Sequence, residues 1–277
     1  MSDYSLSTKK IKEQMAALDF RPKKLFGQNF LVNQASITKI IEVASKLDSE
    51  LIVEIGPGLG ALTEPLSKLG RPLKLIEVDN QLAELWKGKG FDVVLGDALQ
   101  IDWEKLTQLK STTLVSNLPY QISSSIVIER SEYPAGTKNM VLMFQKEVAE
   151  RILSAPRCKP YGLLSVVAQC FWTVELVINL HPQSFFPPPK IASSVLKFEI
   201  NKDCNLDRSL FIKFIKGCFR NRRKYLTSNI KNYCLTGQVN EKNIHEALDR
   251  LNLNHKARAE ELTVSNYVDL FLALRGL

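Results

Sequence analysis

The sequence predicts an α/β fold in which a mostly parallel, doubly wound sheet is followed by a small all-helical domain. The first observation is that short apolar runs alternate with amphipathic segments from residue 37 to about residue 200, as expected of repeated strand–helix units. The second is that strand patterns stop near residue 201, after which three segments carry apolar residues at helical spacing. We therefore expect two domains, residues 1–201 with the sheet and residues 202–277 with helices only.

Seven short runs of β-branched and aliphatic residues are the predicted strands. They are residues 51–55, 73–78, 92–95, 113–116, 139–144, 171–180 and 194–200. The segment between the last two runs, "HPQSFFPPPKIAS", is too rich in proline to form a crossover helix. The last two strands are therefore expected to be antiparallel neighbours at the edge of the sheet.

Composition restricts the class of protein. A chain of 277 residues with 45% hydrophobic residues is long enough for one large core and a second small domain. It has no apolar run of 18 residues, and its N-terminus lacks the apolar segment of a signal peptide, so we expect a cytoplasmic protein without a membrane partner. The five cysteines are scattered without a C-x-x-C pair, which predicts neither a disulfide framework nor a metal site.

A glycine-rich loop, "EIGPGLGALT", follows the first predicted strand. Gly56, Gly58 and Gly60 would let the backbone approach a ligand, and a helix expected to start near Ala61 would turn its free amides toward an anionic group. The spacing G-x-G-x-G is one residue short of the dinucleotide pattern. Glu54, two residues before the first glycine, would repel a pyrophosphate but suit a ligand that carries an ammonium group.

Acidic residues follow the next two predicted strands. Glu77 ends the second strand, where an acid commonly accepts hydrogen bonds from ribose hydroxyls, and Asp97 lies at the tip of the third. Either acid alone would more commonly be a helix cap or a solvated turn. With the glycine loop, however, both lie at the carboxyl ends of successive parallel strands, where open α/β sheets bind ligands. A ribose, an adenine ring and a zwitterionic amino-acid tail would satisfy this set, which favours S-adenosylmethionine over NAD.

The fourth predicted strand ends in "NLPY", residues 117–120. The Asn117 amide oxygen and the Leu118 carbonyl are placed to accept hydrogen bonds from an exocyclic amine, while Pro119 removes a backbone donor and the Tyr120 ring stacks on the base. Such contacts favour methyl transfer to a purine amine, whose lone pair is otherwise delocalised into the ring. A sulfonium methyl donor is already activated, so positioning supplies much of the catalysis. The alternative is that the turn merely ends a strand.

Basic residues cluster between residues 208 and 231, where no acid occurs. A net charge of +8 and a pI near 9.2 already favour an anionic partner, and a solvated helix face would usually mix both signs. We therefore expect phosphate contacts here, with a solvated face as the alternative. The cluster consists of Arg208, Lys213, Lys216, Arg220, Arg222, Arg223, Lys224 and Lys231, of which Arg220, Arg222, Arg223 and Lys224 are the predicted RNA-binding residues. A second basic stretch comprises Lys9, Lys10, Lys12, Arg21, Lys23 and Lys24.

Several motifs together resemble one family over nearly the whole chain. "LFGQNFLVN", "EIGPGLGALT", "IEVD", "GDAL", "NLPYQIS" and "SFFPPPKIASSV" occur in the order found in the KsgA-type rRNA adenine N6-dimethyltransferases. The resemblance implies a class I, Rossmann-like methyltransferase fold and S-adenosylmethionine-dependent dimethylation of two adjacent adenines in the 3′-terminal hairpin loop of small-subunit rRNA. One departure is Ala192, where the family often has an acid.

The same resemblance implies roles for individual residues. The implied cofactor contacts are Asn29, Leu31, Gly56, Gly58, Glu77, Asp97 and Asn117. The implied catalytic residues are Asn117, Leu118, Pro119 and Tyr120, together with Phe185, which would stack on the target base from the opposite side. We expect the RNA to be recognised by its shape, with only a flipped adenine read in the pocket.

Three other functions remain open at this point. An Erm-type methyltransferase would use a similar pocket on large-subunit rRNA. A DNA adenine methyltransferase usually has Asn-Pro-Pro-Tyr in its turn, where this chain has Leu118. A non-catalytic RNA-binding assembly factor could keep the fold without the reaction. For the small-subunit methyltransferase we expect a monomer.

Overall fold

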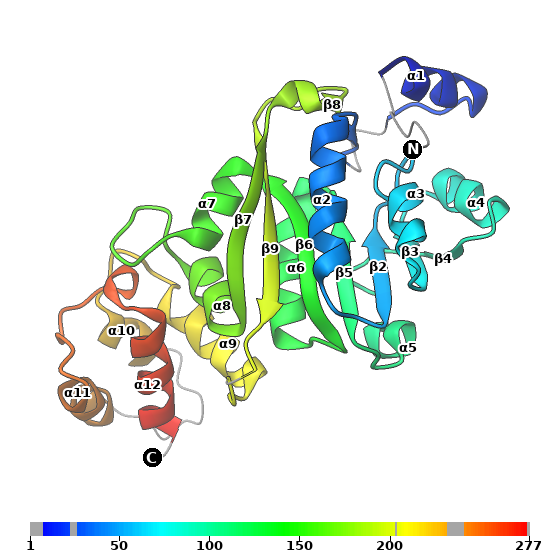
Figure 1. Ribbon diagram of the computed structural model, residues 1–277. Helices are drawn as coiled ribbons and strands as arrows, with labels where there is room; N and C mark the ends of the chain where they lie inside the picture. The colour runs from blue at the N-terminus through cyan, green and yellow to red at the C-terminus, as the bar shows by residue number, and fades with distance from the viewer. Residues whose placement is uncertain (1–7, 23–26, 203, 232–240, 276–277) are drawn as a thin grey trace. The chain divides into compact units, whose positions relative to one another are not determined.

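The computed structural model describes residues 8–22, 27–202, 204–231 and 241–275. The chain forms two compact units, which are described separately (Figure 1). The first unit comprises Met1–Arg130, Pro134–Ala149 and Val174–Ile200, and the second comprises Ser131–Tyr133, Glu150–Thr173 and Asn201–Leu277.

The central sheet has seven strands in the order β4-β3-β2-β5-β6-β9-β7. They are β2 (Leu51–Ile55), β3 (Leu73–Glu77), β4 (Asp92–Leu95), β5 (Thr112–Ser116), β6 (Thr137–Gln145), β7 (Trp172–Leu180) and β9 (Ser193–Ile200). The strands from β2 to β6 are parallel to one another, whereas β9 is antiparallel to β6. All seven predicted strands are confirmed, with ends that differ by at most two residues.

The last two strands are neighbours, and β7 forms the edge of the sheet. Near the end of β7, Asn179 is hydrogen-bonded to Ser194 at the start of β9. Near the start of β7, Thr173 is hydrogen-bonded to Asn201, which directly follows β9. This order indicates the antiparallel pairing that the proline-rich connection predicted. The connection itself forms β8 (Phe185–Phe186), which pairs with β1 (Phe30–Leu31) in a second, two-stranded sheet.

The middle strands are buried because helices cover both faces of the sheet. Every residue of β2 and β5 is buried, as is typical of central strands in a parallel sheet. Figure 1 shows α2 (Gln34–Lys46) on one face and α6 (Tyr120–Glu132) on the other. The remaining helices up to residue 153 are α1 (Thr8–Ala17), α3 (Thr63–Leu66), α4 (Asn80–Gly88), α5 (Trp103–Thr107) and α7 (Lys146–Leu153).

The helix after the glycine loop differs from the prediction. It begins at Thr63 rather than near Ala61 and continues as the 3-10 segment Ser67–Leu69 before Gly70 ends it in the left-handed conformation. An α-helix of four residues has few aligned amides and a weak dipole. The glycine loop itself, and not the helix terminus, therefore presents the backbone to a ligand.

The second unit is built from helices around an aromatic core. Its helices are α8 (Leu163–Phe171), α9 (Arg208–Cys218), α10 (Leu226–Lys231), α11 (Glu241–Arg250) and α12 (Val264–Arg275). Phe211 packs edge-on against both Phe171 and Phe271. Residues 150–173 thus belong to this compact unit, although the predicted division at residue 201 counted them with the sheet. That residues 1–201 and 202–277 form two separate domains stays a prediction.

None of the helices in the described ranges is both long and apolar enough to cross a membrane.

Candidate active site

A cavity of about 330 Å³ opens where β2, β3 and β5 end at their carboxyl termini. This is where the sequence places the glycine loop, the acid that follows the second strand and the Asn-Leu-Pro-Tyr turn. Ten of the predicted site residues line it: Asn29, Leu31, Gly56, Gly58, Glu77, Asp97, Asn117, Leu118, Pro119 and Tyr120. The structure therefore brings together segments that are up to 91 residues apart in the chain, from Asn29 to Tyr120.

The glycines of the loop have different tasks. All three have positive φ, namely 68° at Gly56, 54° at Gly58 and 95° at Gly60. A Cβ on Gly56 would have no neighbour within 4 Å, which leaves its backbone open to the cavity. A Cβ on Gly60 would lie 2.5 Å from the Trp86 ring, so this glycine is needed for packing. Trp86 also donates a 2.9 Å hydrogen bond from Nε1 to the Gly58 carbonyl, a support of the loop that sequence reasoning missed.

Glu77 is held rigidly at the cavity wall. Its Oε1 accepts hydrogen bonds from the backbone amides of Val78 (2.9 Å) and Asp79 (3.0 Å), and its Oε2 accepts one from Gly58 (3.4 Å). Burial raises the pKa of Glu77, while these backbone hydrogen bonds act against that rise. The carboxylate is thus preorganised, with lone pairs left over for ligand hydroxyls.

Asp97 and Glu54 add two further acidic groups to the lining. Asp97 is half-buried, and its Oδ1 accepts a 2.9 Å hydrogen bond from the amide of Leu99. Glu54 is buried, and within the described residues its Oε2 has no hydrogen-bond partner. Burial raises the pKa of Glu54 to about 8, and the nearby Glu77 carboxylate adds to the rise. A buried carboxyl group with one oxygen left unpaired fits a ligand that brings its own positive charge.

The Asn-Leu-Pro-Tyr turn is fixed by two side-chain hydrogen bonds. Asn117 donates from Nδ2 to the main-chain carbonyl of Asn29 at 2.9 Å, which leaves its Oδ1 as the acceptor. The Tyr120 hydroxyl lies 2.8 Å from Oγ of Ser193, a buried residue at the start of β9. Burial raises the pKa of Tyr120, so the phenol stays neutral at physiological pH. Asn29 thus helps to build the site through its carbonyl, and Ser193 is a contributor that the sequence did not single out.

Phe185 is not among the residues that line this cavity, and its place beside the target base stays a prediction. Its ring is 3% exposed and belongs to the core cluster that includes Leu31 and Leu180. Side chains alternate along a strand, so Phe185 of β8 points into this core cluster and Phe186 points to the opposite side. Phe186 is half-buried, packs with Phe30, and has Nζ of Lys12 5.4 Å from its ring centroid.

The helix α1 supplies part of the same region. Its Ile11 is fully buried and lines the cavity, while Lys9 and Lys12 are exposed. Lys23 and Lys24, the end of the second predicted basic stretch, lie outside the described residues.

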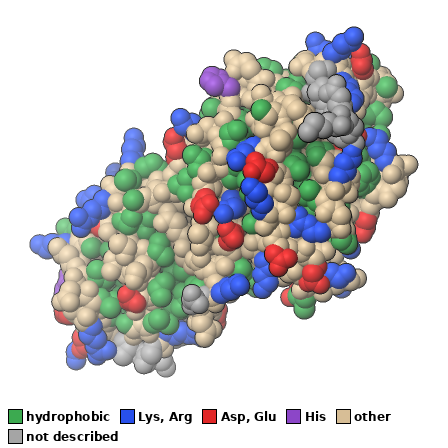
Figure 2. Space-filling view, in the orientation of Figure 1, with side chains coloured by type: hydrophobic (Ala, Val, Ile, Leu, Met, Phe, Trp, Pro, Cys, Tyr) green, Lys and Arg blue, Asp and Glu red, His purple; other side chains and the backbone are tan. Residues whose placement is uncertain are grey.

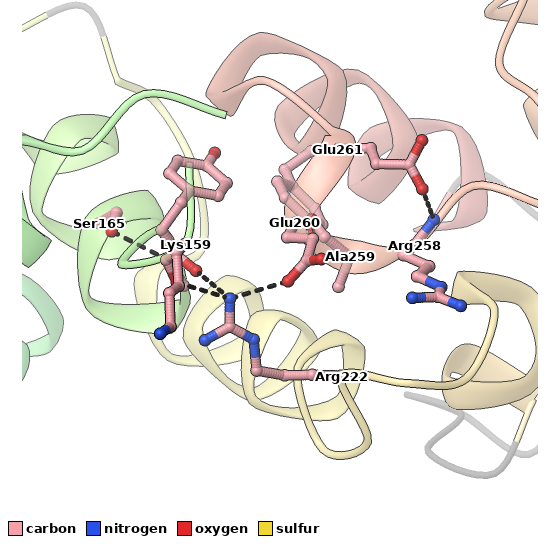
Figure 3. A network of polar contacts seen from close by, with 10 residues as sticks. Lys159, Ser165, Arg222, Arg258, Ala259, Glu260 and Glu261 are labelled. Atoms are coloured by element: carbon pink, nitrogen blue, oxygen red, sulfur yellow. Dashed lines mark hydrogen bonds and ion pairs between the residues drawn. The ribbon is translucent and has the colours of Figure 1, made fainter. Parts of the chain in front are cut away.

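Arg222 differs from the other predicted RNA-binding residues. Its Nη2 lies 2.8 Å from a carboxylate oxygen of Glu260 and donates 3.0 Å hydrogen bonds to the carbonyls of Lys159 and Tyr161 (Figure 3). This guanidinium braces three segments of the helical unit against one another. Because its Nη2 is engaged by three acceptors within the chain, Arg222 has a structural role, which the acid-free local sequence did not reveal.

Two more members of the basic cluster are also engaged within the chain. Arg208 donates to the Ser131 carbonyl at 2.9 Å, and its guanidinium carbon lies 4.5 Å from the Phe171 ring centroid. Lys231 forms a 2.6 Å ion pair with Glu241. Five members remain exposed and form no ion pair with any described residue: Lys213, Lys216, Arg220, Arg223 and Lys224.

Both parts of the chain expose charges of both signs. In the view of Figure 2, basic and acidic side chains are both exposed on the helical unit, and both signs also alternate over β7 and β9. On these strands Lys197 pairs with Glu175 at 3.0 Å and with Glu199 at 2.7 Å. The five exposed cations of the basic cluster that form no ion pair with any described residue remain the candidates for phosphate contact.

Comparisons with known proteins agree with this arrangement. A family model described as ribosomal RNA adenine dimethylase matches residues 19–271. A ribosomal RNA small subunit methyltransferase A from Bdellovibrio bacteriovorus is 44% identical over 267 residues, which are 96% of this chain and 97% of that protein. The protein of the same name from Natranaerobius thermophilus is 33% identical, with 96% of this chain and 95% of that one covered.

Solved structures show the same fold. A dimethyladenosine transferase from Plasmodium falciparum aligns with a TM-score of 0.75 at 27% identity, over 89% of this chain and 98% of that one. The 23S rRNA methyltransferase ErmE aligns with a TM-score of 0.64 at 22% identity, over 89% of this chain and 100% of that one, which shows the fold alone. The predicted methyltransferase fold and the family resemblance are confirmed. The chain belongs to the ribosomal RNA adenine dimethylase family of rRNA methyltransferases.

Proposed function

We propose that the protein transfers methyl groups from S-adenosylmethionine to N6 of two adjacent adenines in the 3′-terminal hairpin loop of small-subunit rRNA. The observation that carries this proposal is that the glycine loop, Glu77 and the turn from Asn117 to Tyr120 line the same cavity. The relatives named small subunit methyltransferases support the choice of ribosomal subunit.

The cavity fits the proposed cofactor in charge and in shape. The open backbone at Gly56 leaves room for close approach, and the preorganised Glu77 oxygens suit two ribose hydroxyls. The Glu54 Oε2, which has no partner among the described residues, suits the ammonium group of the amino-acid tail, and Asp97 offers a further acceptor. Asn29 and Leu31 would cover the cofactor from the side of β1. When bound, the cofactor supplies a methyl group that its sulfonium has already activated.

The chain's own residues then orient the acceptor amine. The Asn117 Oδ1 and the Leu118 carbonyl accept its two hydrogens, which draws the lone pair out of conjugation with the purine ring. The Tyr120 ring, tied to Ser193, stacks on the base. After transfer the nitrogen is positively charged and strongly acidic, so its proton leaves without a strong base. Positioning is thus the chain's main contribution to the rate.

The exposed cations of the helical unit would hold the rRNA backbone. Arg220, Arg223 and Lys224 are exposed without an ion pair to any described residue, so their charges are available to phosphates. Arg222 would act here through the fold rather than by direct contact. We also propose a monomeric enzyme that acts in the cytoplasm on immature small subunits.

Transfer of a labelled methyl group tests the function. Purified protein is incubated with labelled S-adenosylmethionine and with unmethylated small subunits, large subunits or DNA in parallel. We expect N6,N6-dimethyladenine in the small subunits alone. Label in large subunits would indicate an Erm-type enzyme, label in DNA a DNA methyltransferase, and no label with retained RNA binding an assembly factor. Each of these three outcomes overturns the proposal.

A further inference from the structure

Two cysteines that are 34 residues apart in the sequence meet in the helical unit. The Sγ atoms of Cys170 and Cys204 are 3.7 Å apart, within range of a thiol hydrogen bond. Cys170 lies in the last turn of α8 and is buried, whereas Cys204 is partly exposed in the segment between β9 and α9. One sulfur is therefore held by a helix, and the other lies in irregular chain that solvent can reach.

The surroundings shift the pKa values of the two thiols in opposite directions. The hydrogen bond from Cys170 lowers the pKa of Cys204, and the positive charge of Arg208 acts in the same direction. The same hydrogen bond, together with burial, raises the pKa of Cys170. Arg208 is itself half-buried and held by Ser131 and Phe171, so its charge stays near the sulfurs. Cys204 is thus the more accessible and the more acidic of the two thiols, and Cys170 lies behind it.

We propose that Cys204 and Cys170 form a reversible thiol–disulfide pair that hydroperoxides oxidise. The Cys204 thiolate attacks a peroxide oxygen, so that a sulfur–oxygen bond forms, the oxygen–oxygen bond breaks, and the leaving oxygen takes up the proton that the thiol released and departs as an alcohol or water. Cys170 then attacks the sulfenic sulfur of Cys204. The disulfide forms, the sulfur–oxygen bond breaks and the Cys170 proton leaves with the hydroxide as water. Two thiols are oxidised and one peroxide is reduced, and a dithiol reductant reverses the change.

The geometry allows the bond after a small movement. A disulfide needs about 2.05 Å between sulfurs, so the two atoms must approach each other by less than about 2 Å. Rotation of the Cys204 side chain with a small shift of its irregular segment supplies this, because no helix or strand holds that residue. The bond would tie the chain that enters α9 to the end of α8, four residues before the contact that Arg208 makes with Phe171.

The other described cysteines provide matched controls. Cys158 is exposed but has no cysteine partner among the described residues, and Cys218 is fully buried. If exposure alone governed oxidation, Cys158 would react first. If the pairing of Cys170 with Cys204 governs oxidation, Cys204 reacts faster than Cys158 and ends as a disulfide, not as a sulfinic or sulfonic acid.

The experiment uses the full-length protein, equimolar hydrogen peroxide, alkylation of the remaining thiols, and non-reducing peptide mass spectrometry. We expect a linked peptide that contains Cys170 and Cys204, formed at least tenfold faster than any oxidation of Cys158 and removed by dithiothreitol. In Cys170→Ser, Cys204 should stop at a sulfenic acid that dimedone labels, and Cys204→Ser should show neither product. Cys158→Ser should behave as the parent does.

A second measurement does not depend on the variants. The oxidised parent should melt at a higher temperature than the reduced parent, because the bond restricts the unfolded chain. The inference is overturned if Cys170 and Cys204 both remain alkylatable while Cys158 oxidises. It is equally overturned if Cys204 proceeds to a sulfinic acid in the parent without the linked peptide.

Discussion

The side-chain amide of Asn117 donates a 2.9 Å hydrogen bond to the main-chain carbonyl of Asn29, 88 residues earlier in the chain. A carbonyl can only accept, so this bond decides which end of the amide is the nitrogen. The Asn117 oxygen is thereby left as an acceptor in the cavity, as transfer to an amine requires. The same bond joins the Asn-Leu-Pro-Tyr turn to the residue that precedes β1.

Asn117→Ala should fold and bind RNA but lose methyl transfer by about 10²-fold or more, because one acceptor of the adenine amine is gone. Asn117→Asp should also be slow, since it keeps the oxygens but cannot donate to Asn29. Single-turnover methylation and the melting temperature are measured together. A variant that is less stable but keeps its rate per folded molecule would show that Asn117 only ends a strand.

Tyr120→Phe should keep most of its rate, because stacking uses the face of the ring, whereas Tyr120→Ala should be severely slowed. The Phe variant leaves the buried Ser193 hydroxyl without its partner, so it should lose about 1 kcal/mol of unfolding free energy. Urea unfolding together with single-turnover rates separates the two effects. Equal rates for the Phe and Ala variants would refute stacking by this ring.

Glu77→Ala should weaken S-adenosylmethionine binding by roughly 1.5 to 3 kcal/mol, because two ribose hydroxyls lose a charged and preorganised acceptor. Calorimetric titration measures the change. Glu84→Ala is the control, since Glu84 is exposed in an ion pair with Lys87 and does not line the cavity. Unchanged affinity in a folded Glu77→Ala protein would remove this residue from the cofactor site.

Glu54→Gln should stabilise the cofactor-free protein at high pH. Burial raises the pKa of Glu54 to about 8 in the folded chain, so between about pH 4.5 and pH 8 the folded state holds a proton that the unfolded state has released. The parent therefore loses stability as the pH rises, by up to about 1.4 kcal/mol per pH unit. Glutamine does not titrate, so the advantage of the variant should grow from pH 5 to pH 8. Denaturant melts at several pH values would contradict this if parent and variant changed in parallel.

Replacing Arg220, Arg223 and Lys224 together by Ala should weaken rRNA binding and reduce its salt dependence, by a slope of about 0.7 to 0.9 for each lost phosphate contact. Their exposure predicts little change in stability or in cofactor affinity. Arg222→Ala is the matched contrast and should lower the melting temperature, since its guanidinium braces Glu260, Lys159 and Tyr161. An identical salt slope in parent and triple variant would make this segment a merely solvated face.

Most of the sheet could be predicted because its signals are local. Runs of β-branched and aliphatic residues specify buried strands, and glycine and proline mark where these strands end. In a parallel sheet the carboxyl ends of the strands share one edge, so Glu77, Asp97 and Asn117 could be assigned to one site before any coordinates were known. The family could also be recognised from the sequence, because its motifs are short local patterns that occur in a fixed order along the chain.

Other features depend on contacts between distant segments, which local patterns do not encode. Phe185 is turned into the core by the pairing of two-residue strands, and Arg222 is neutralised by an acid 38 residues later. The meeting of Cys170 with Cys204, 34 residues later, likewise arises only in the folded helical unit. The sequence by itself thus determined the sheet, the chemistry at its edge and the family. Tertiary structure alone decided which aromatic rings are buried and which charged side chains form ion pairs, because both depend on residues that are close in space but distant in the chain.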